Sequence, residues 1–433
     1  MGEGVLAVPF GQRVPFAARD AGFFCEEVPA ESIALAAGTP TFVYSASAIR
    51  ERYHRLTSAL KDCPVRVHYS MKANGNRAVI TLLRELGSGI DVVSGGELAK
   101  ALRAGFGAHD IVQGGVGKTA TELREAVQVG VKLINVESLE ELVLLNAIAG
   151  EMGAVASVGL RVNPEVTVTN PHAYIATGAK GHKFGIPHVS ALAVARDAIA
   201  MQHVNLCALD MHVGSQLSTM EPYRDGLNRL KELTLQVRSA GATIKYIDIG
   251  GGLPVVYQAG DAEPDLAGYA DLVGKVIREL GVELIVEPGR FFVGASGVLV
   301  TRVLYRKESG GKQYVIVDAG MNDLLRPSHY DSYHQIDAVK PSGKRVTADV
   351  VGPVCETGDF LALDREVDDV QPGDLVVLHG AGAYGYVMSS NYNARPRAAE
   401  VMVEGHRFAV VTARESYDDM MRLEHEDPNW RDA

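Results

Sequence analysis

The residue with the clearest chemical potential is Lys72, which follows the alternating stretch Val65–Met71 and directly precedes the small residues Ala73, Asn74 and Gly75. The alternation predicts a β-strand, so the lysine would stand at a strand end, just before a turn. In a mostly enclosed pocket an ammonium loses hydration and its pKa falls, and the neutral amine can then condense with an aldehyde cofactor. The alternative is an ordinary strand-end lysine whose ammonium reaches solvent.

Other reactive or ligand-binding residue types also stand at the ends of apolar stretches. They are His212 and Ser215, then Gly250, Gly251 and Gly252 after Asp248, and finally Glu287, Gly289 and Arg290. Glycines lack Cβ atoms, so their backbone N–H groups can approach phosphate oxygens closely, although flexible turns use the same residues. Glu287 and Arg290 could equally form a structural ion pair, and a lone strand-end histidine is often structural. Each of these features is ambiguous by itself.

The elements that would position these residues repeat as strand, turn and amphipathic helix from about residue 64. The predicted strands are Val65–Met71, Gly89–Val93, Asp110–Gly114, Lys132–Val136, Ser157–Val162, Leu206–His212, Lys245–Ile249 and Glu283–Val286. Helices with apolar residues spaced three and four apart are expected at Asn76–Leu86, Gly96–Ala104, Thr121–Val129, Glu221–Ala240 and Asp265–Leu280. Eight such units favour an α/β fold closed as a (β/α)8 barrel, whose chemistry lies at the C-terminal ends of the strands.

After Arg290 the helical pattern is lost and strands separated by turns are expected instead. They are Val298–Tyr305, Lys312–Val317, Arg345–Val351, Asp374–Leu378, Ala398–Val403 and His406–Val411. We expect an antiparallel β-sandwich or barrel domain here, which the early strand Thr41–Tyr44 joins, ahead of a helix at Ser47–Leu60. The predicted domains are therefore a barrel over residues 45–292 and a β domain made of residues 1–44 with 293–433.

Closure of the barrel would bring the strand-end residues to one mouth. A lysine on strand one, a histidine on strand six, glycines after strand seven and a carboxylate after strand eight would then face one another. Barrels of this kind often bind phosphate after strands seven and eight. Pyridoxal 5′-phosphate needs this set: an amine for its aldehyde, phosphate donors, a ring to stack on its face and a partner for its pyridine nitrogen.

One nucleotide-binding motif is incomplete. Gly114–Thr119 resembles the end of a P-loop, but Val112 occupies the position of the required first glycine. We therefore expect no ATP site there.

Composition limits the class of protein. The 433 residues are 47% hydrophobic and 22% charged, enough for a large domain and a smaller one. A formal net charge of −11 without a basic block argues against nucleic acid as a partner. Cys25, Cys63, Cys207 and Cys355 lack metal-ligand and disulfide spacing, which suits a reducing cytoplasm. Met1–Leu6 does not begin a signal peptide and no long apolar run follows, so we expect neither secretion nor a membrane span.

A series of ordered motifs extends over most of the chain. The motifs are Tyr69–Asn74, Asn135–Ser138, Lys183–Gly185, His212–Gln216, Gly250–Gly252, Glu287–Arg290, Cys355–Asp359 and Gly382–Gly385. In this set the chain resembles the fold type III pyridoxal-phosphate decarboxylases, which share the alanine racemase fold. The resemblance implies a homodimer in which Cys355 and Glu356 reach the site of the second subunit.

The resemblance also implies roles for individual residues. Lys72 would bind the cofactor covalently and His212 would stack on its ring, while Glu287 would pair with the ring nitrogen. The other implied cofactor contacts are Ser215, Gly250, Gly251, Gly252, Asp91, Gly289, Arg290 and Tyr384. The implied substrate contacts are Arg290, Arg326, Tyr330, Glu356 and Tyr384.

A carboxylate at position 287 favours decarboxylation, because it keeps the pyridine nitrogen protonated and so strengthens the electron sink. Racemases of this fold have an arginine there. Protonation of the substrate Cα is assigned to Cys355, with Lys72 as the competing donor. The alternative for Cys355 is an inert buried thiol.

The expected substrate carries a second amino-acid head. Glu356 would bind its ammonium and Arg326 with Tyr330 its carboxylate, which favours meso-2,6-diaminopimelate, decarboxylated to L-lysine. Arg326 could instead be an ordinary residue at the rim. Two rival interpretations are a decarboxylase of ornithine, arginine or carboxynorspermidine, and a non-catalytic pyridoxal-phosphate protein.

Overall fold

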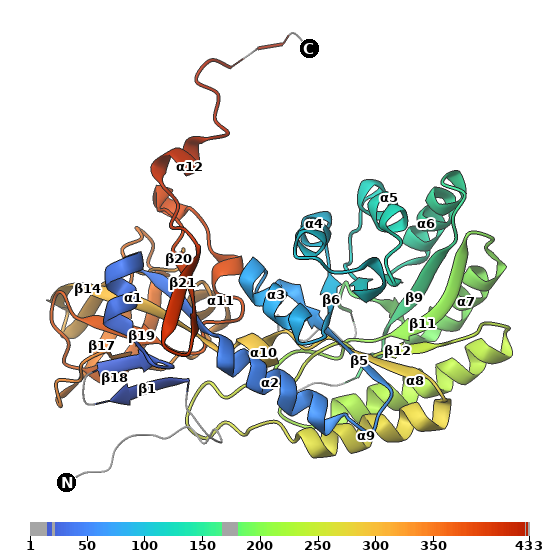
Figure 1. The fold of residues 1–433 in the computed structure, drawn as a ribbon, viewed down its shortest axis with the longest axis horizontal. Coiled ribbons are helices and arrows are strands. Elements are labelled where there is room, and N and C mark those ends of the chain that lie inside the picture. The colour runs from blue at the N-terminus through green and yellow to red at the C-terminus, as the bar shows by residue number, and fades with distance from the viewer. Residues whose placement is uncertain (1–14, 20–21, 167–180, 429, 432–433) are drawn as a thin grey trace. The chain divides into compact units, whose positions relative to one another are not determined.

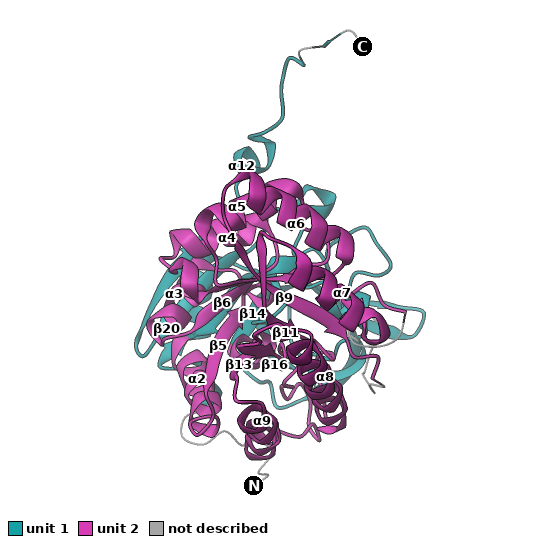
Figure 2. Ribbon diagram, turned by 90° about the vertical axis from the view of Figure 1, so that its right-hand side faces the viewer, with its two compact units in different colours: residues 1–45, 297–433 teal, residues 46–296 magenta. Residues whose placement is uncertain are grey.

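The computed structural model describes residues 15–19, 22–166, 181–428 and 430–431, so Met1–Leu6 lies outside the described residues. The chain divides into two compact units (Figures 1 and 2). One comprises residues 46–296, and the other comprises residues 1–45 with 297–433.

The first unit is a closed parallel barrel, as the sequence predicts. Its eight strands among the described residues are β5 (Val65–Ser70), β6 (Gly89–Val92), β7 (Ile111–Gln113), β8 (Leu133–Val136), β9 (Ala156–Asn163), β11 (Val204–Asp210), β12 (Tyr246–Asp248) and β13 (Glu283–Val286). They pair in the order β9-β11-β12-β13-β5-β6-β7-β8, and β8 also pairs with β9, which closes the ring. The sequence did not predict β10 (Ile186–Pro187), which adds to β9.

Helices surround this ring of strands (Figure 2). They are α2 (Ala46–Ala59), α3 (Arg77–Glu85), α4 (Gly95–Arg103), α5 (Ala120–Val129), α6 (Leu139–Glu151), α7 (His188–Ala200), α8 (Glu221–Ser239) and α9 (Leu266–Leu280). Several begin at a side chain that accepts a backbone N–H: Asn76 for α3, Ser94 for α4, Thr119 for α5 and Ser138 for α6. These caps fix where each strand-end loop stops.

The barrel interior changes from apolar to polar along the barrel axis. Val112, Leu133, Cys207, Ala208 and Ile285 pack together as a buried apolar cluster. Polar side chains follow at the C-terminal ends of the strands: Asp91, Gln113, Asn135, Asp210 and Asp248 are all buried there. Buried polar groups need partners, so this end of the barrel is where a polar ligand or an ion-pair network belongs.

The second unit is a β unit with a mixed sheet. Its large sheet contains β4 (Thr41–Ser45), β14 (Gly297–Ser309), β15 (Lys312–Val317), β16 (Ile336–Ala338), β17 (Arg345–Val351), β18 (Phe360–Asp368), β19 (Leu375–Leu378), β20 (Ala399–Glu404) and β21 (Arg407–Thr412). A small sheet holds β1 (Phe16–Arg19), β2 (Gly22–Cys25) and β3 (Val28–Pro29). Most pairs are antiparallel, as expected, but β15–β17 and β4–β20 are parallel.

The expectation that helices vanish after Arg290 is wrong. The described residues beyond that point include α10 (Arg290–Val293), α11 (Arg326–Tyr330) and α12 (Tyr417–Met421), and α1 (Ala30–Ala37) belongs to the β unit. The helices α10, α11 and α12 have only four or five residues, which is too short to show an apolar period of 3.6, so the pattern did not reveal them.

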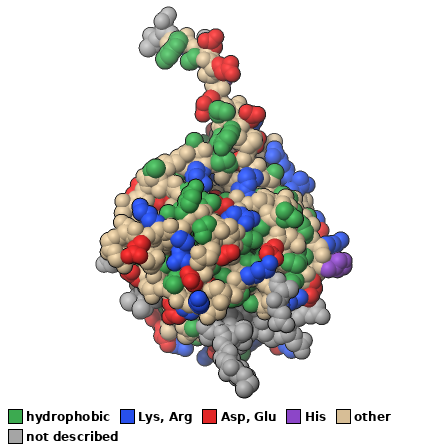
Figure 3. All heavy atoms as spheres, turned by 90° about the vertical axis from the view of Figure 1, so that its left-hand side faces the viewer, with side chains coloured by type: hydrophobic (Ala, Val, Ile, Leu, Met, Phe, Trp, Pro, Cys, Tyr) green, Lys and Arg blue, Asp and Glu red, His purple; other side chains and the backbone are tan. Residues whose placement is uncertain are grey.

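Within the described part of the chain, no helix is long and apolar enough to cross a bilayer. On the face drawn in Figure 3, basic and acidic side chains are interspersed. All four cysteines are free.

A buried carboxyl group lies in the turn that leads to α11. Asp323 is 1% exposed, and one of its oxygens accepts the Gly320 N–H at 3.0 Å. Burial raises its pKa to about 7 against the smaller opposing effect of that hydrogen bond. The folded state therefore keeps this proton at pH values where an unfolded aspartate, with a pKa of about 3.9, has lost it.

The Asp323→Asn variant is expected to flatten the pH dependence of stability. The stabilisation from the retained proton is complete below about pH 4 and is lost as pH rises through about 7. The difference between the folded and unfolded pKa values corresponds to at most about 4 kcal/mol of unfolding free energy. The asparagine oxygen can still accept from Gly320 but cannot ionise. Urea unfolding at pH 5 and pH 8 provides the test. The free energy of unfolding should fall less between these two pH values in the variant than in the wild type, and an equal fall in both proteins would contradict the assignment.

Candidate active site

Lys72 lies in a 3₁₀ turn, η1 (Met71–Ala73), directly after β5. Its Nζ is 3.1 Å from Asp91 Oδ2, and the same oxygen accepts a hydrogen bond from Ser70 at 2.8 Å. Ser70 and Asp91 are register partners on neighbouring strands, so the sheet itself aligns this carboxylate with the turn. The Lys72 side chain is 42% exposed and forms an ion pair with the buried carboxylate of Asp91, and the expected enclosed pocket stays a prediction.

The three glycines after β12 form a tight turn in which side chains do not fit. Gly250 and Gly252 have φ of +63° and +108°, which favours glycine. A Cβ on Gly251 would lie 2.5 Å from the carbonyl oxygen of Glu287. The Gly251 N–H donates to His212 Nδ1 at 3.3 Å. The turn therefore presents bare backbone beside the histidine ring.

His212 has an electrostatic environment that keeps its ring neutral. Burial lowers its pKa well below the ordinary value, and the nearby cations of Arg161 and Lys72 lower it further. The Nδ1 atom accepts from Gly251, so any ring proton is on Nε2. A neutral, oriented imidazole is suited to stacking on a flat ligand.

Arg290 and Ser215 lie together, from two different strand ends. The Ser215 Oγ accepts hydrogen bonds from Arg290 Nε at 3.3 Å and Nη2 at 3.1 Å, and Arg290 Nη1 donates to the Tyr257 hydroxyl at 2.8 Å. Arg290 is 8% exposed, and a Cβ on Gly289 before it would lie 3.0 Å from the Ser70 carbonyl oxygen. A guanidinium and a hydroxyl beside a glycine turn can bind an anion such as phosphate.

Glu287, which is partly exposed, lies among the buried acids Asp91, Asp210 and Asp248. Burial raises its pKa well above the usual range, and the charges of Asp248, Asp91 and Asp210 raise it further. Burial also raises the pKa of Asp248 to about 6, although hydrogen bonds from the Gly250 N–H and with Glu287 oppose this. The Gly250 N–H donates to Asp248 at 2.9 Å, and the Glu287 N–H donates to the Gly250 carbonyl at 2.8 Å. This carboxyl pair can hold a proton near neutral pH and can ionise against a cationic ligand.

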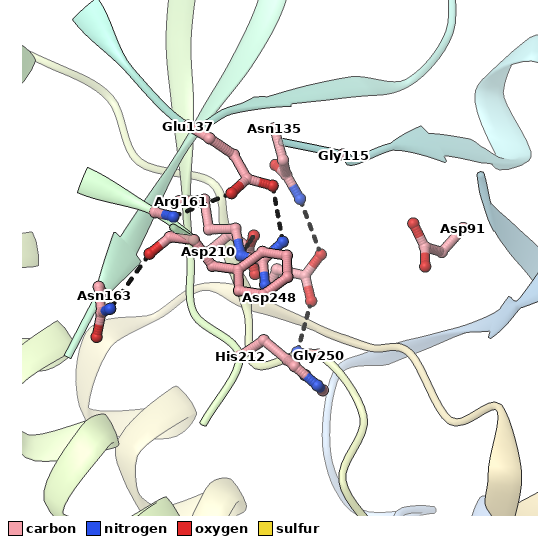
Figure 4. Close-up of polar contacts among 12 residues, drawn as sticks. Asp91, Gly115, Asn135, Glu137, Arg161, Asn163, Asp210, His212, Asp248 and Gly250 are labelled. Carbon is pink, nitrogen blue, oxygen red and sulfur yellow. Dashed lines mark hydrogen bonds and ion pairs between the residues drawn. The ribbon is translucent and has the colours of Figure 1, made fainter. Parts of the chain in front are cut away.

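An ion-pair network that the sequence analysis did not identify lies beside these acids (Figure 4). Arg161 on β9 is 2.8 Å from Glu137 and 3.9 Å from Asp210. Glu137 also accepts the Gly185 N–H at 2.9 Å. The available signal was a charged residue at the centre of an apolar strand, Leu160-Arg161-Val162, which a buried strand tolerates only with partners.

Lys118, in the incomplete P-loop motif, has a different role. Its side chain is 1% exposed, forms an ion pair with Glu141 at 2.7 Å and donates to the carbonyl oxygens of Gly115 and Asn135. These contacts tie the loops after β7 and β8 together.

The β unit holds the remaining candidates. Arg326, on α11, is 5% exposed, and Tyr330 lies one turn further along the same helix. Cys355 is exposed, so the alternative of a buried inert thiol is wrong, and its N–H donates to Asn393 at 2.8 Å. The adjacent Glu356 accepts from the Tyr392 hydroxyl at 3.4 Å. Tyr384 has a φ of +55°, a strained value for a residue other than glycine.

Comparisons with known proteins agree with this arrangement. Residues 46–294 match the family model described as "Pyridoxal-dependent decarboxylase, pyridoxal binding domain". A relative from Aquifex aeolicus, named diaminopimelate decarboxylase, is 44% identical over 92% of this chain and 95% of its own. A relative of the same name from Pseudomonas aeruginosa is 45% identical over 94% and 97% of the two chains.

Solved structures give the same result. The chain resembles Helicobacter pylori diaminopimelate decarboxylase complexed with L-lysine, with a TM-score of 0.88 and 36% identity over 91% of this chain and 98% of that one. Diaminopimelate decarboxylase from m. jannaschii in complex with L-lysine is also similar, with a TM-score of 0.90 and 34% identity over 95% of this chain and 98% of that one.

Proposed function

This chain belongs to the pyridoxal-dependent decarboxylases, and from that premise we propose that it decarboxylates meso-2,6-diaminopimelate to L-lysine and CO2 with pyridoxal 5′-phosphate. The names of its relatives and the L-lysine in two similar structures support this substrate. The observation that carries the proposal is the grouping, at one end of the barrel, of an amine, an anion site and a proton-holding carboxyl pair.

The barrel residues fit this cofactor. The glycine turn carries no Cβ where one would clash with the Glu287 carbonyl oxygen, and Ser215 with Arg290 offers donors for a phosphate. Lys72 provides the amine for the aldehyde, Asp91 orients that amine, and His212 provides the neutral ring. When bound, the cofactor supplies an aldehyde that takes up the substrate's amine and a ring that withdraws electrons from its Cα.

The chain's own residues would direct the reaction. Glu287 would hold a proton on the ring nitrogen, because an ionised carboxylate stabilises that N–H⁺. Its neighbour Asp248 could retain the proton that the carboxyl pair carries. After CO2 leaves, Cys355 would protonate the substrate Cα, with Lys72 as the competing donor. The exposure of the Cys355 residue supports this role.

The β unit would recognise the end of the substrate that does not react. Arg326 and Tyr330 would bind its carboxylate and Glu356 its ammonium, with Arg290 and Tyr384 as further contacts. A substrate such as ornithine has no distal carboxylate and would leave the Arg326 guanidinium without its ligand. This favours diaminopimelate over the simple diamine precursors.

Release of CO2 from each candidate amino acid tests the substrate. We expect turnover of meso-2,6-diaminopimelate with L-lysine as the product. Strong turnover of ornithine, arginine or carboxynorspermidine without turnover of diaminopimelate would support the rival decarboxylases. Cofactor binding without turnover of any amino acid would support a non-catalytic pyridoxal-phosphate protein.

We also propose a homodimer with shared active sites, in the cytoplasm. The exposure of both Cys355 and Glu356 supports their reaching a second subunit, and four free cysteines suit a reducing compartment. Sedimentation at assay concentration tests the dimer, which a fully active monomer would exclude.

The Gly251→Ala variant is expected to weaken cofactor binding by roughly tenfold or more, since each 1.4 kcal/mol is a factor of ten. Its Cβ would lie 2.5 Å from the Glu287 carbonyl oxygen, so the backbone of the turn must shift beside the proposed phosphate site. Gly117→Ala is the matched control, because a Cβ at Gly117 meets nothing within 4 Å. Titration of both variants with pyridoxal phosphate measures the difference, and equal affinities would exclude this role for the turn.

A further inference from the structure

A buried histidine with no assigned role contacts Arg326. His334 is 0% exposed and lies between α11 and β16. Its Nε2 is 3.1 Å from Arg326 Nη1, and its Nδ1 is 2.7 Å from the carbonyl oxygen of His379. Both contacts lie within the β unit. The imidazole therefore bridges a guanidinium and a backbone carbonyl.

These two partners leave one possible form of the ring. A carbonyl oxygen can only accept, so Nδ1 must carry a hydrogen. A guanidinium can only donate, so Nε2 must present its lone pair. His334 is thereby fixed as the neutral Nδ1–H tautomer, and its orientation is set from the carbonyl side.

The carbonyl is itself held by regular structure. β16 and β19 pair antiparallel, with Ile336 opposite Leu378, and the His379 N–H donates to the Gln335 carbonyl at 2.9 Å. The backbone of His334 is held as well, because Arg365 Nη1 donates to its carbonyl oxygen at 3.0 Å. The imidazole is therefore a rigid support.

We propose that His334 is a positioning residue that holds the Arg326 guanidinium ready for the carboxylate of a bound amino-acid head. This inference rests on the proposed function, in which Arg326 binds that carboxylate. Arginine has several rotatable bonds, and a ligand that must order them loses affinity. A hydrogen bond from Nη1 to a fixed acceptor orders the side chain in advance, so less order has to be imposed when a carboxylate binds.

The test compares His334→Leu with His334→Gln in the cofactor-loaded enzyme, with L-lysine binding measured by calorimetry. L-Lysine retains the amino-acid head that decarboxylation leaves intact. Leucine removes the acceptor, so L-lysine affinity should fall by about tenfold to a hundredfold, as for loss of a hydrogen bond to a charged group. The KM for diaminopimelate should rise similarly while kcat changes by less than about threefold. Glutamine can accept from Arg326 and donate to the His379 carbonyl, so it should restore most of the affinity.

A double-mutant cycle with Arg326→Ala separates positioning from general damage. If His334 acts through Arg326, adding His334→Leu to Arg326→Ala should have no further effect on L-lysine affinity. Asp337→Asn is the control for a change in β16 near this histidine, because Asp337 contacts the His379 ring at 2.9 Å. The Asp337→Asn variant should bind L-lysine with the wild-type affinity.

The outcomes are distinguishable. Normal L-lysine affinity in His334→Leu would overturn this inference but not the proposed function. The same holds if the losses of affinity caused by His334→Leu and Arg326→Ala are additive in the double variant. If the leucine variant does not fold, His334→Asn replaces it: its side chain is too short to reach both partners, so affinity equal to that of His334→Gln would overturn the inference. Wild-type protein that binds no L-lysine, or an Arg326→Ala variant that binds it normally, would overturn the proposed function as well.

Discussion

The Lys72→Ala variant is expected to lose covalent attachment of the cofactor and to decarboxylate diaminopimelate at least about a thousandfold more slowly. The Lys72 Nζ lies at the end of β5 beside Asp91, at the barrel end that also holds the glycine turn and the Ser215–Arg290 pair. Without this amine, the aldehyde has no covalent partner there. Borohydride reduction of the wild-type protein followed by peptide mass spectrometry should place the cofactor on Lys72.

A second lysine close to the same turn is the control for this experiment. Lys100 Nζ donates to the Gly75 carbonyl at 3.4 Å, so Lys100→Ala removes a nearby amine without touching the Asp91 pair. It should keep both the cofactor and nearly all of the activity. A reduced adduct on another residue, or full activity in Lys72→Ala, would contradict the assignment.

The architecture of the barrel could be predicted because each strand has a local signal. Apolar strand stretches alternate with helices whose starts carry capping side chains such as Ser94 and Thr119, and the observed strands agree with the predicted ones to within one or two residues. The β unit was less predictable. β18 was missed because it alternates irregularly, and the parallel pairing of β4 with β20 joins segments more than three hundred residues apart, which no local pattern encodes.

The candidate site was predictable to a similar extent. Lys72, His212, Ser215, the three glycines and Glu287 could be identified because each stands at a strand end, where the topology determines its neighbours. The surroundings of these residues could not be derived in the same way. The Arg161–Glu137 pair depends on the closure of β9 against β8, and the exposure of Lys72 depends on side-chain packing. The number of acids near Glu287 likewise follows only from the closed ring.

That concentration of acids determines how Glu287 can work. Burial raises the pKa of Glu287, and the charges of Asp91, Asp210 and Asp248 raise it further. The carboxyl group therefore keeps its proton at pH values where an ordinary glutamate has lost it. A positive charge beside it would favour the ionised form instead. Glu287 is therefore suited to exchange a proton with a basic ring nitrogen, and a glutamine in its place could hydrogen-bond but could not supply the negative charge.

The Glu287→Gln variant is expected to lower kcat by roughly a hundredfold or more, the usual effect of removing a group that stabilises transition-state charge. With the cofactor bound, a protonated ring nitrogen would strengthen the stabilisation of the negative charge left at the substrate Cα when CO2 departs, and glutamine could not hold that proton there by charge. Borohydride reduction should still place the cofactor on Lys72, which would separate this loss from a loss of binding. Glu283→Gln is the matched control, because Glu283 begins the same strand, β13, and pairs with Arg66 at 2.6 Å. Its kcat should stay near the wild-type value, and a Glu287→Gln enzyme with kcat within about threefold of wild type would show that the ring proton does not depend on this carboxylate.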